Sequence, residues 1–184
     1  MNRYRKYQMD FDSKAIWFSG IGMGMPIFLL AVYYLFLQEI GQVPLGKQIL
    51  YLWSPIVLSF AYLVLLRIVR WNAPGVFAIV GAAMCLLLMI QLFFTGNALR
   101  IVLGIVAYLA GGGLLILCAG GYLPGRMVAS LPFLAVLVVR LLCFRNASGW
   151  LWLPEIASLS MIAGLMLLPV AFREGKPLKT EKNA

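Results

Sequence analysis

Long apolar runs, separated by short polar or turn-forming segments, fill most of this chain. Each run holds about 18–23 residues, which lets an α-helix rising 1.5 Å per residue cross a hydrocarbon core about 30 Å thick. The runs predict six helices: Ala15–Leu37, Ile49–Val69, Gly75–Phe94, Ala98–Ala119, Met127–Phe144 and Pro154–Phe172. Because lipid offers backbone groups no hydrogen bonds, we expect an all-α membrane protein, a polytopic bundle of six transmembrane helices with short loops.

The connections between the runs carry residues that end helices. Asn72-Ala73-Pro74-Gly75 and the Gly120–Gly125 segment contain Gly and Pro, which favour left-handed dihedrals and remove a backbone donor, respectively. Short connections make consecutive helices antiparallel neighbours. The third and fourth helices are separated only by Thr95-Gly96-Asn97, so one long, bent helix is the alternative there.

Basic residues lie unevenly on the two predicted sides of the membrane. With the N-terminus inside, inner segments hold 11 of the 15 Lys and Arg residues and outer segments hold 4. Positive residues resist translocation, so we expect both termini in the cytoplasm. This divides the chain into a basic cytoplasmic segment (1–14), a transmembrane domain (15–172) and a basic cytoplasmic tail (173–184), which we expect to be disordered and to rest near anionic lipid.

The tryptophans give an independent indication of the same topology. Indole rings favour the membrane–water interface. The five tryptophans all fall near predicted helix ends, at Trp17, Trp53, Trp71, Trp150 and Trp152. We therefore expect a multi-pass protein of a cell membrane, most simply a bacterial cytoplasmic membrane, with the bilayer as its first partner.

Composition agrees with this interpretation and excludes several function classes. Hydrophobic residues make up 63% of the chain and charged residues 11%, too few to cover a soluble domain of this size. The net charge of +9 fits lipid headgroups, and no basic stripe interleaved with aromatics indicates nucleic-acid binding. Cys85, Cys118 and Cys143 lie at different predicted depths, so we expect buried thiols and no shared disulfide.

The outer ends of the last two helices hold the clearest candidate polar site. Arg140 lies about one turn inside its helix, and Glu155 is the second residue of the next helix, after Pro154. Pro suits the first helical turn, and a carboxylate there complements the helix dipole. Because a charge in the membrane is costly unless paired, we predict an Arg140–Glu155 ion pair, joined by Arg100 and Glu39.

Two interpretations of this site remain open. A small anion could bind Arg140, Arg145 and Arg100, whose guanidinium groups match carboxylate or phosphate geometry. Alternatively, the arginines extend to lipid headgroups and clamp the helices at the interface.

Small residues predict close helix packing in two places. Gly20 and Gly24 have the spacing that lets helix backbones approach closely, and a partner subunit could use the same face. Gly104, Ala107 and Gly111 follow steps of three and four residues, so they share one helix face. Pro26, Pro55 and Pro132 fall inside predicted helices, where we expect kinks.

The residues that catalysis usually needs are absent or badly placed. There is no histidine, and no Lys, Asp or Glu lies mid-span to activate a nucleophile or carry a proton. The pattern shows no metal-ligand cluster, and we expect no cofactor. We therefore do not expect an enzyme.

In size and helix count the chain resembles the substrate-binding subunits of energy-coupling-factor vitamin transporters. Their first helix docks through an alanine-based small-xxx-small motif, to which Gly20 and Gly24 are the nearest match here. The likeness is one of architecture, and it implies a non-enzymatic solute-binding or transport-associated subunit that works with another membrane subunit. A second hypothesis is a membrane scaffold or assembly protein without a ligand. A third is an intramembrane enzyme that acts on lipid through Glu155 or Glu39.

Overall fold

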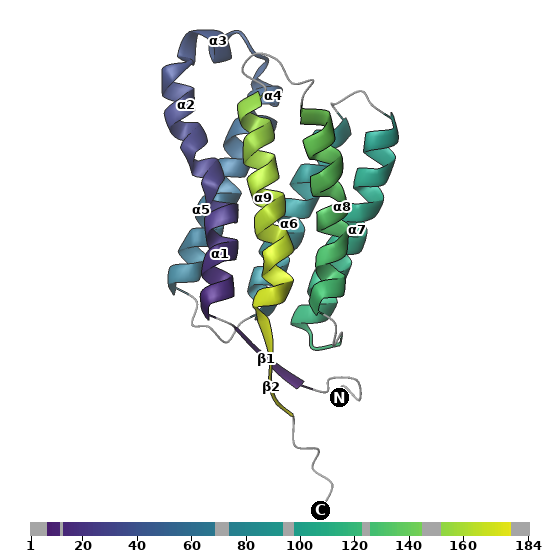
Figure 1. Cartoon of the computed structure of the whole chain (residues 1–184). Helices are drawn as coiled ribbons and strands as arrows, with labels where there is room; N and C mark the ends of the chain where they lie inside the picture. The colour runs from purple at the N-terminus through teal and green to yellow at the C-terminus, as the bar shows by residue number, and fades with distance from the viewer. Residues whose placement is uncertain are drawn as a thin grey trace, which may run out of the picture.

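The chain folds into a bundle of long, roughly parallel and antiparallel helices (Figure 1). The structure, a computed structural model, describes residues 7–11, 13–68, 74–93, 98–122, 126–144 and 152–177. The first part of the chain forms α1 (Ser13–Gly24), the 3₁₀ segment η1 (Met25–Phe28), α2 (Leu29–Leu35), α3 (Leu37–Gly41), α4 (Leu45–Gln48), the π segment η2 (Ile49–Trp53) and α5 (Ser54–Ile68). The remainder forms α6 (Pro74–Phe93), α7 (Ala98–Ala119), α8 (Arg126–Phe144) and α9 (Trp152–Ala171).

Four of these helical stretches are long and apolar enough to cross a membrane: Leu45–Ile68, Pro74–Phe93, Arg100–Ala119 and Leu153–Ala171. Two shorter apolar stretches, Ala15–Ala31 and Met127–Leu141, lie beside them in the bundle. An integral membrane protein is therefore the class that the fold supports. The third and fourth predicted helices are separate, as expected, because α6 ends at Phe93 and α7 packs back against it.

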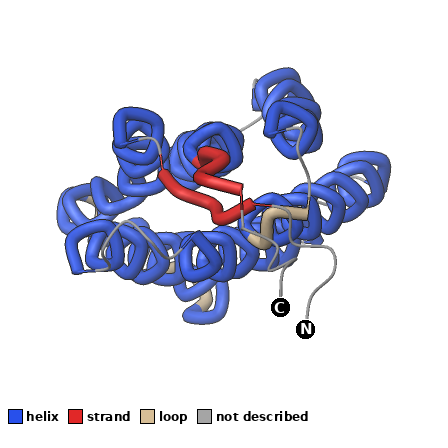
Figure 2. Tube along the Cα trace, turned by 90° about the horizontal axis from the view of Figure 1, so that it is seen from below, coloured by secondary structure: helices blue, strands red, loops and turns tan. Residues whose placement is uncertain are grey.

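The helices close into a ring in which each packs against its neighbours in the chain. The order around the ring is α1, α5, α6, α7, α8 and α9, and α9 closes the ring by packing against both α8 and α1 (Figures 1 and 2). The last helix is also the most enclosed of the four long apolar stretches, with 56% of its most apolar segment buried inside the bundle. Its inward face, including Met161, Leu165 and Leu168, is fully buried, so this face of α9 forms part of the core of the bundle.

The three prolines that were predicted to kink helices have different effects. Pro26 lies in the 3₁₀ segment η1, and Pro55 is the second residue of α5, two residues after the π segment η2 ends. The helix departs from α geometry at Pro26 and in the turn before Pro55, as expected near a residue that cannot donate its backbone hydrogen bond. In contrast, α8 continues as an α-helix through Pro132.

Glycines let two helix backbones touch, but the glycine of α1 that does so is not one of the predicted pair. A Cβ on Gly22 would lie 2.8 Å from the backbone nitrogen of Gly164, so α1 and α9 touch backbone to backbone. Gly20 and Gly24 instead face Leu66 and Leu63 of α5. Leu66 and Leu63 therefore pack over the two predicted glycines within the chain.

The predicted face of α7 is also used within the bundle. Gly104 contacts Leu92 of α6, and Gly111 packs against the ring of Phe133 of α8. Ala107, between them, is only partly buried and lines a pocket.

A two-stranded antiparallel sheet at one end of the bundle was not predicted. Strand β1 (Tyr7–Phe11) pairs with β2 (Phe172–Pro177), with Asp10 opposite Arg173 and Phe11 opposite Phe172. The all-α expectation omitted this sheet, and the prediction of a disordered tail from Arg173 is wrong as far as Pro177. The composition of the tail is polar, but pairing with a second strand satisfies its backbone groups. The sheet holds the two ends of the bundle's chain together (Figure 1).

Candidate functional site

Three charged side chains meet at the end of the bundle opposite the sheet. Arg100 lies in the first turn of α7, Arg140 lies one turn before the end of α8, and Glu155 lies in the first turn of α9. Because α8 runs antiparallel to both α7 and α9, these three positions come to the same level of the bundle.

Glu155 is shared by the two arginines. Arg100 Nη2 lies 3.2 Å from both carboxylate oxygens, and Arg140 Nη1 lies 3.3 Å from Oε2. Charge-assisted hydrogen bonds between guanidinium and carboxylate are usually about 2.7–2.9 Å, and the strongest are two parallel bonds from two nitrogens. Arg140 does not make that arrangement, so its guanidinium keeps donor capacity beyond Glu155.

Helix dipoles explain why a carboxylate is needed here. The N-terminal ends of α7 and α9 both carry positive partial charge, which disfavours Arg100 and favours Glu155. Arg140 lies near the C-terminal end of α8, where a cation is favoured. Glu155 therefore compensates both the dipole of its own helix and the unfavourable position of Arg100.

Arg140 is almost completely enclosed by the helices. Its side chain is 2% exposed, against 12% for Arg100 and 19% for Glu155. The Nε of Arg140 is buried and has no hydrogen-bond partner among the residues that the structure describes. A buried donor of a charged group is costly to leave without a partner. Arg140 is therefore suited to contact a further anion.

Neutral polar groups surround the ion pairs and satisfy one another. The buried amide of Gln91 donates to the carbonyl of Leu50 at 3.0 Å and lies 3.1 Å from the hydroxyl of Ser158. Ser158 also lies 2.9 Å from the carbonyl of Pro154, one residue before Glu155. The Tyr51 hydroxyl donates to the carbonyl of Gln91 at 3.2 Å. This network fixes the first turn of α9 against α6 and the π segment.

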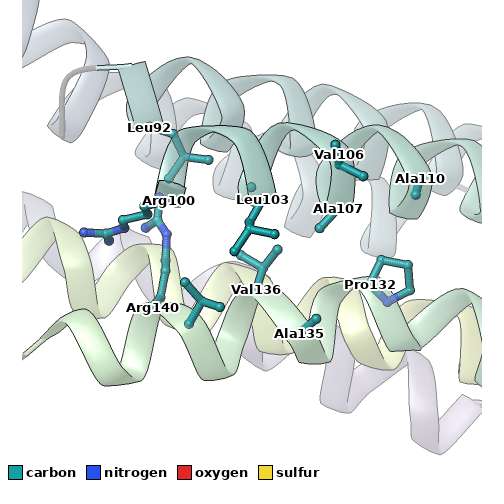
Figure 3. A pocket seen from close by; sticks show the side chains of 12 residues that line it. Leu92, Arg100, Leu103, Val106, Ala107, Ala110, Pro132, Ala135, Val136 and Arg140 are labelled. Atoms are coloured by element: carbon teal, nitrogen blue, oxygen red, sulfur yellow. The ribbon is translucent and has the colours of Figure 1, made fainter. Parts of the chain in front are cut away.

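An apolar groove extends from the arginines between α7 and α8 (Figure 3). Its volume is about 490 Å³, which is in the range of small-molecule sites, about 300–1,000 Å³. Arg100 and Arg140 lie together at one end, while Ala110 and Pro132 lie at the other (Figure 3). The remaining walls are aliphatic: Leu92, Leu103, Gly104, Val106, Ala107, Ala135, Val136 and Val139.

The groove opens sideways, toward the surface that lipid would cover. Leu103 is 48% exposed and Val106 is 63% exposed, and Ala110 and Ala135 are exposed as well. The opening therefore lies on the flank of the bundle, between two helices, and it runs from the arginines toward the middle of the bundle.

The structure brings together Arg140, Glu155 and Arg100, three of the five residues that the sequence singled out for an ion pair or ligand. Arg145 lies outside the described residues, and Glu39 lies in α3 with its side chain outside them. Gln91, Ser158 and Tyr51 were not assigned to the site from the sequence. From the sequence, Gln91 and Ser158 were recognisable only as polar residues within apolar helices.

Other chemistry is limited in the described part of the chain. It contains no group of three or more His, Cys, Asp or Glu side chains that could hold a metal ion. Cys85 and Cys118 are buried and form no disulfide with each other. The cluster of two arginines and one glutamate offers binding of an anion rather than nucleophilic attack, since it includes no nucleophile beside a base.

The chain matches no protein-family model, no curated protein and no solved structure.

Proposed function

We propose that this protein is a non-enzymatic membrane subunit that binds an anionic ligand through Arg100 and Arg140. The observation that carries the proposal is the enclosed guanidinium of Arg140, which shares one carboxylate with Arg100 and lines a groove that opens on the flank of the bundle. A clamp that only anchored the bundle at the interface would expose its arginines to headgroups. Arg140 is instead buried among helices, where it adds specificity for a negatively charged group.

Binding of small anions tests this function. The protein in nanodiscs of zwitterionic lipid is titrated with butyl phosphate, and with butylammonium as the matched cation, by isothermal titration calorimetry. The expected result is binding of butyl phosphate alone, weakened at least tenfold by Arg140→Gln, since a hydrogen bond to a charged group contributes about 1.5–3 kcal/mol. Arg67→Gln, at the exposed end of α5, is the control and should bind like the unchanged protein.

Two results would overturn the function. One is the absence of butyl phosphate binding by the unchanged protein, which would favour a scaffold without a ligand. The other is equal binding by the Arg140→Gln and Arg67→Gln variants, which would place the anion elsewhere.

We further propose that six segments cross the membrane and that both termini lie in the cytoplasm. Two observations support this topology: the pairing of β1 with β2 keeps both ends of the bundle on one side, and α8 has 19 residues, about 28 Å. The excess of basic residues near that side is the orientation signal. Reporter fusions should find both ends in the cytoplasm, and a reporter after residue 97 outside it. Ends in opposite compartments would refute the six-span topology.

A further inference from the structure

The groove and the arginines form a single amphiphilic site. Its walls are aliphatic over its whole length, and its charge is confined to the end at Arg100 and Arg140 (Figure 3). A water-soluble anion would use the charged end and leave the aliphatic walls without a partner. A molecule with an anionic head and an apolar chain would use both.

From these contacts, we infer that the ligand is a single-chain anionic lipid that enters sideways from the bilayer, with its head group on Arg100 and Arg140 and its chain between α7 and α8. This inference rests on the proposed function and specifies its ligand class. The charge complementarity comes from Arg140, a buried cation at this end of the groove whose Nε has no hydrogen-bond partner among the described residues. The head would lie at the end of the bundle away from the sheet, at the level of the predicted outer interface.

The dimensions favour one chain. From Arg100 to Ala110 the groove follows ten residues of α7, about 15 Å of helix. A chain that lies along this length stays inside the hydrocarbon region, since both helices run through it. The small side chains of Ala107, Ala110 and Ala135 keep the floor open, and larger residues at these positions would fill it.

Specificity for the chain must come from packing. Moving a chain from lipid to an aliphatic groove gives no hydrophobic gain, because both surroundings are apolar. The fit of the chain against Val136 and Ala135, and the anchoring of its head by the arginines, would therefore decide binding. The site should distinguish long anions from long cations, and long anions from short ones.

Mutations can test the head-group end of the groove separately from the part that would hold the chain. Ala135 is five residues before Arg140, about 7.5 Å along α8, so a chain of four carbons bound at the arginines stays clear of it while a chain of twelve passes it. Ala135→Phe therefore blocks the chain and spares the head-group site. Ala110→Phe does the same from α7, which keeps the test valid if one variant fails to fold. Val138→Phe is the control, since Val138 is exposed on α8 outside the groove.

The experiment compares dodecyl phosphate with butyl phosphate in the same nanodiscs of zwitterionic lipid. Partition of dodecyl phosphate into the bilayer is equal for all variants, so a change in the affinity ratio of the two phosphates reports the groove alone. We expect Ala135→Phe and Ala110→Phe to reduce this ratio at least tenfold, with butyl phosphate affinity within twofold of the unchanged protein. Val138→Phe should leave both affinities within twofold.

The results separate the failure of this inference from the failure of the proposed function. If butyl phosphate binds but the affinity ratio is the same in all variants, the ligand is a small anion and the lipid inference is overturned while the function stands. If neither phosphate binds to the unchanged protein, both are overturned. If dodecyltrimethylammonium binds as tightly as dodecyl phosphate, the groove takes ordinary lipid chains without head-group recognition, which also overturns the inference.

Discussion

At the scale of single residues, Glu155 decides whether a buried arginine is tolerated. Arg140 is 2% exposed, and its carboxylate partner is the one that Arg100 also contacts. Removing one member of a buried ion pair is costly because it leaves an uncompensated charge, whereas replacing both members with neutral groups is often harmless. Glu155 therefore stabilises the bundle mainly by compensating charge.

This argument predicts a non-additive effect. Glu155→Gln alone should lower the thermal stability of the purified protein strongly, by an amount of the order of 3 kcal/mol, because Arg140 stays buried without its carboxylate. Adding Arg140→Leu should restore part of that loss, since the buried charge is then removed. Thermal unfolding in detergent, followed by circular dichroism, measures both.

The matched control for this pair is Arg67→Gln, which removes an exposed charge at the other end of the bundle. It should change stability by less than about 0.5 kcal/mol. A double variant as unstable as the sum of its two single variants would show that the charges do not depend on one another.

At the scale of elements, glycines bring the backbones of α1 and α9 into direct contact. Gly22 and Gly164 face each other, and a Cβ on Gly164 would lie 2.7 Å from the backbone nitrogen of Met23. The hydroxyl of Ser19 adds a hydrogen bond to the carbonyl of Gly164 at 2.9 Å. Close backbone approach and a short interhelical hydrogen bond are what hold helices together in lipid, where no hydrophobic force acts between them.

Gly164→Ala should therefore separate α1 from α9 and cost about 1–3 kcal/mol, since backbone cannot move aside as a flexible side chain can. Gly113→Ala on α7 is the control, because a Cβ there meets nothing within 4 Å. The control should be neutral or stabilising by up to about 1 kcal/mol through helix propensity. Loss of unfolding temperature in Gly113→Ala equal to that in Gly164→Ala would contradict the packing argument.

At the scale of the whole molecule, the short sheet joins the two ends of the helical ring. Residues near the start of α1 and the end of α9 pair as β1 and β2, so the first and last helices are joined both by their own packing and by backbone hydrogen bonds. Both strands therefore lie at the same end of the bundle.

Cross-linking tests the register of this sheet. Asp10→Cys with Arg173→Cys places two thiols at opposed positions, about 5 Å apart between Cα atoms, within the range of a disulfide. In a protein whose three native cysteines are replaced by alanine, mild oxidation should link the pair efficiently. Asp10→Cys with Pro177→Cys, offset by four residues or roughly 13 Å, should not link. Efficient linkage of the offset pair would show that the strands are not held in this register.

The sequence by itself determined the parts of this protein that depend on length and hydropathy. The apolar runs predicted where α6, α7, α8 and α9 begin and end to within a few residues, because lipid requires continuous helices of a set length. Pairing a charge at the start of one helix with a charge at the end of the preceding one also suggested Arg140 and Glu155. These inferences are local: they follow from neighbouring residues and the environment.

Tertiary structure alone decided which faces meet. Gly22 rather than Gly24 contacts α9, and Gln91 reaches Ser158 from a helix far away in the chain, because helix rotation and ring order depend on the packing of all helices together. The β1–β2 pairing likewise joins segments more than 150 residues apart, which no local pattern indicates. The groove between α7 and α8 exists only because small side chains on two helices face one another, and that juxtaposition is a property of the folded bundle.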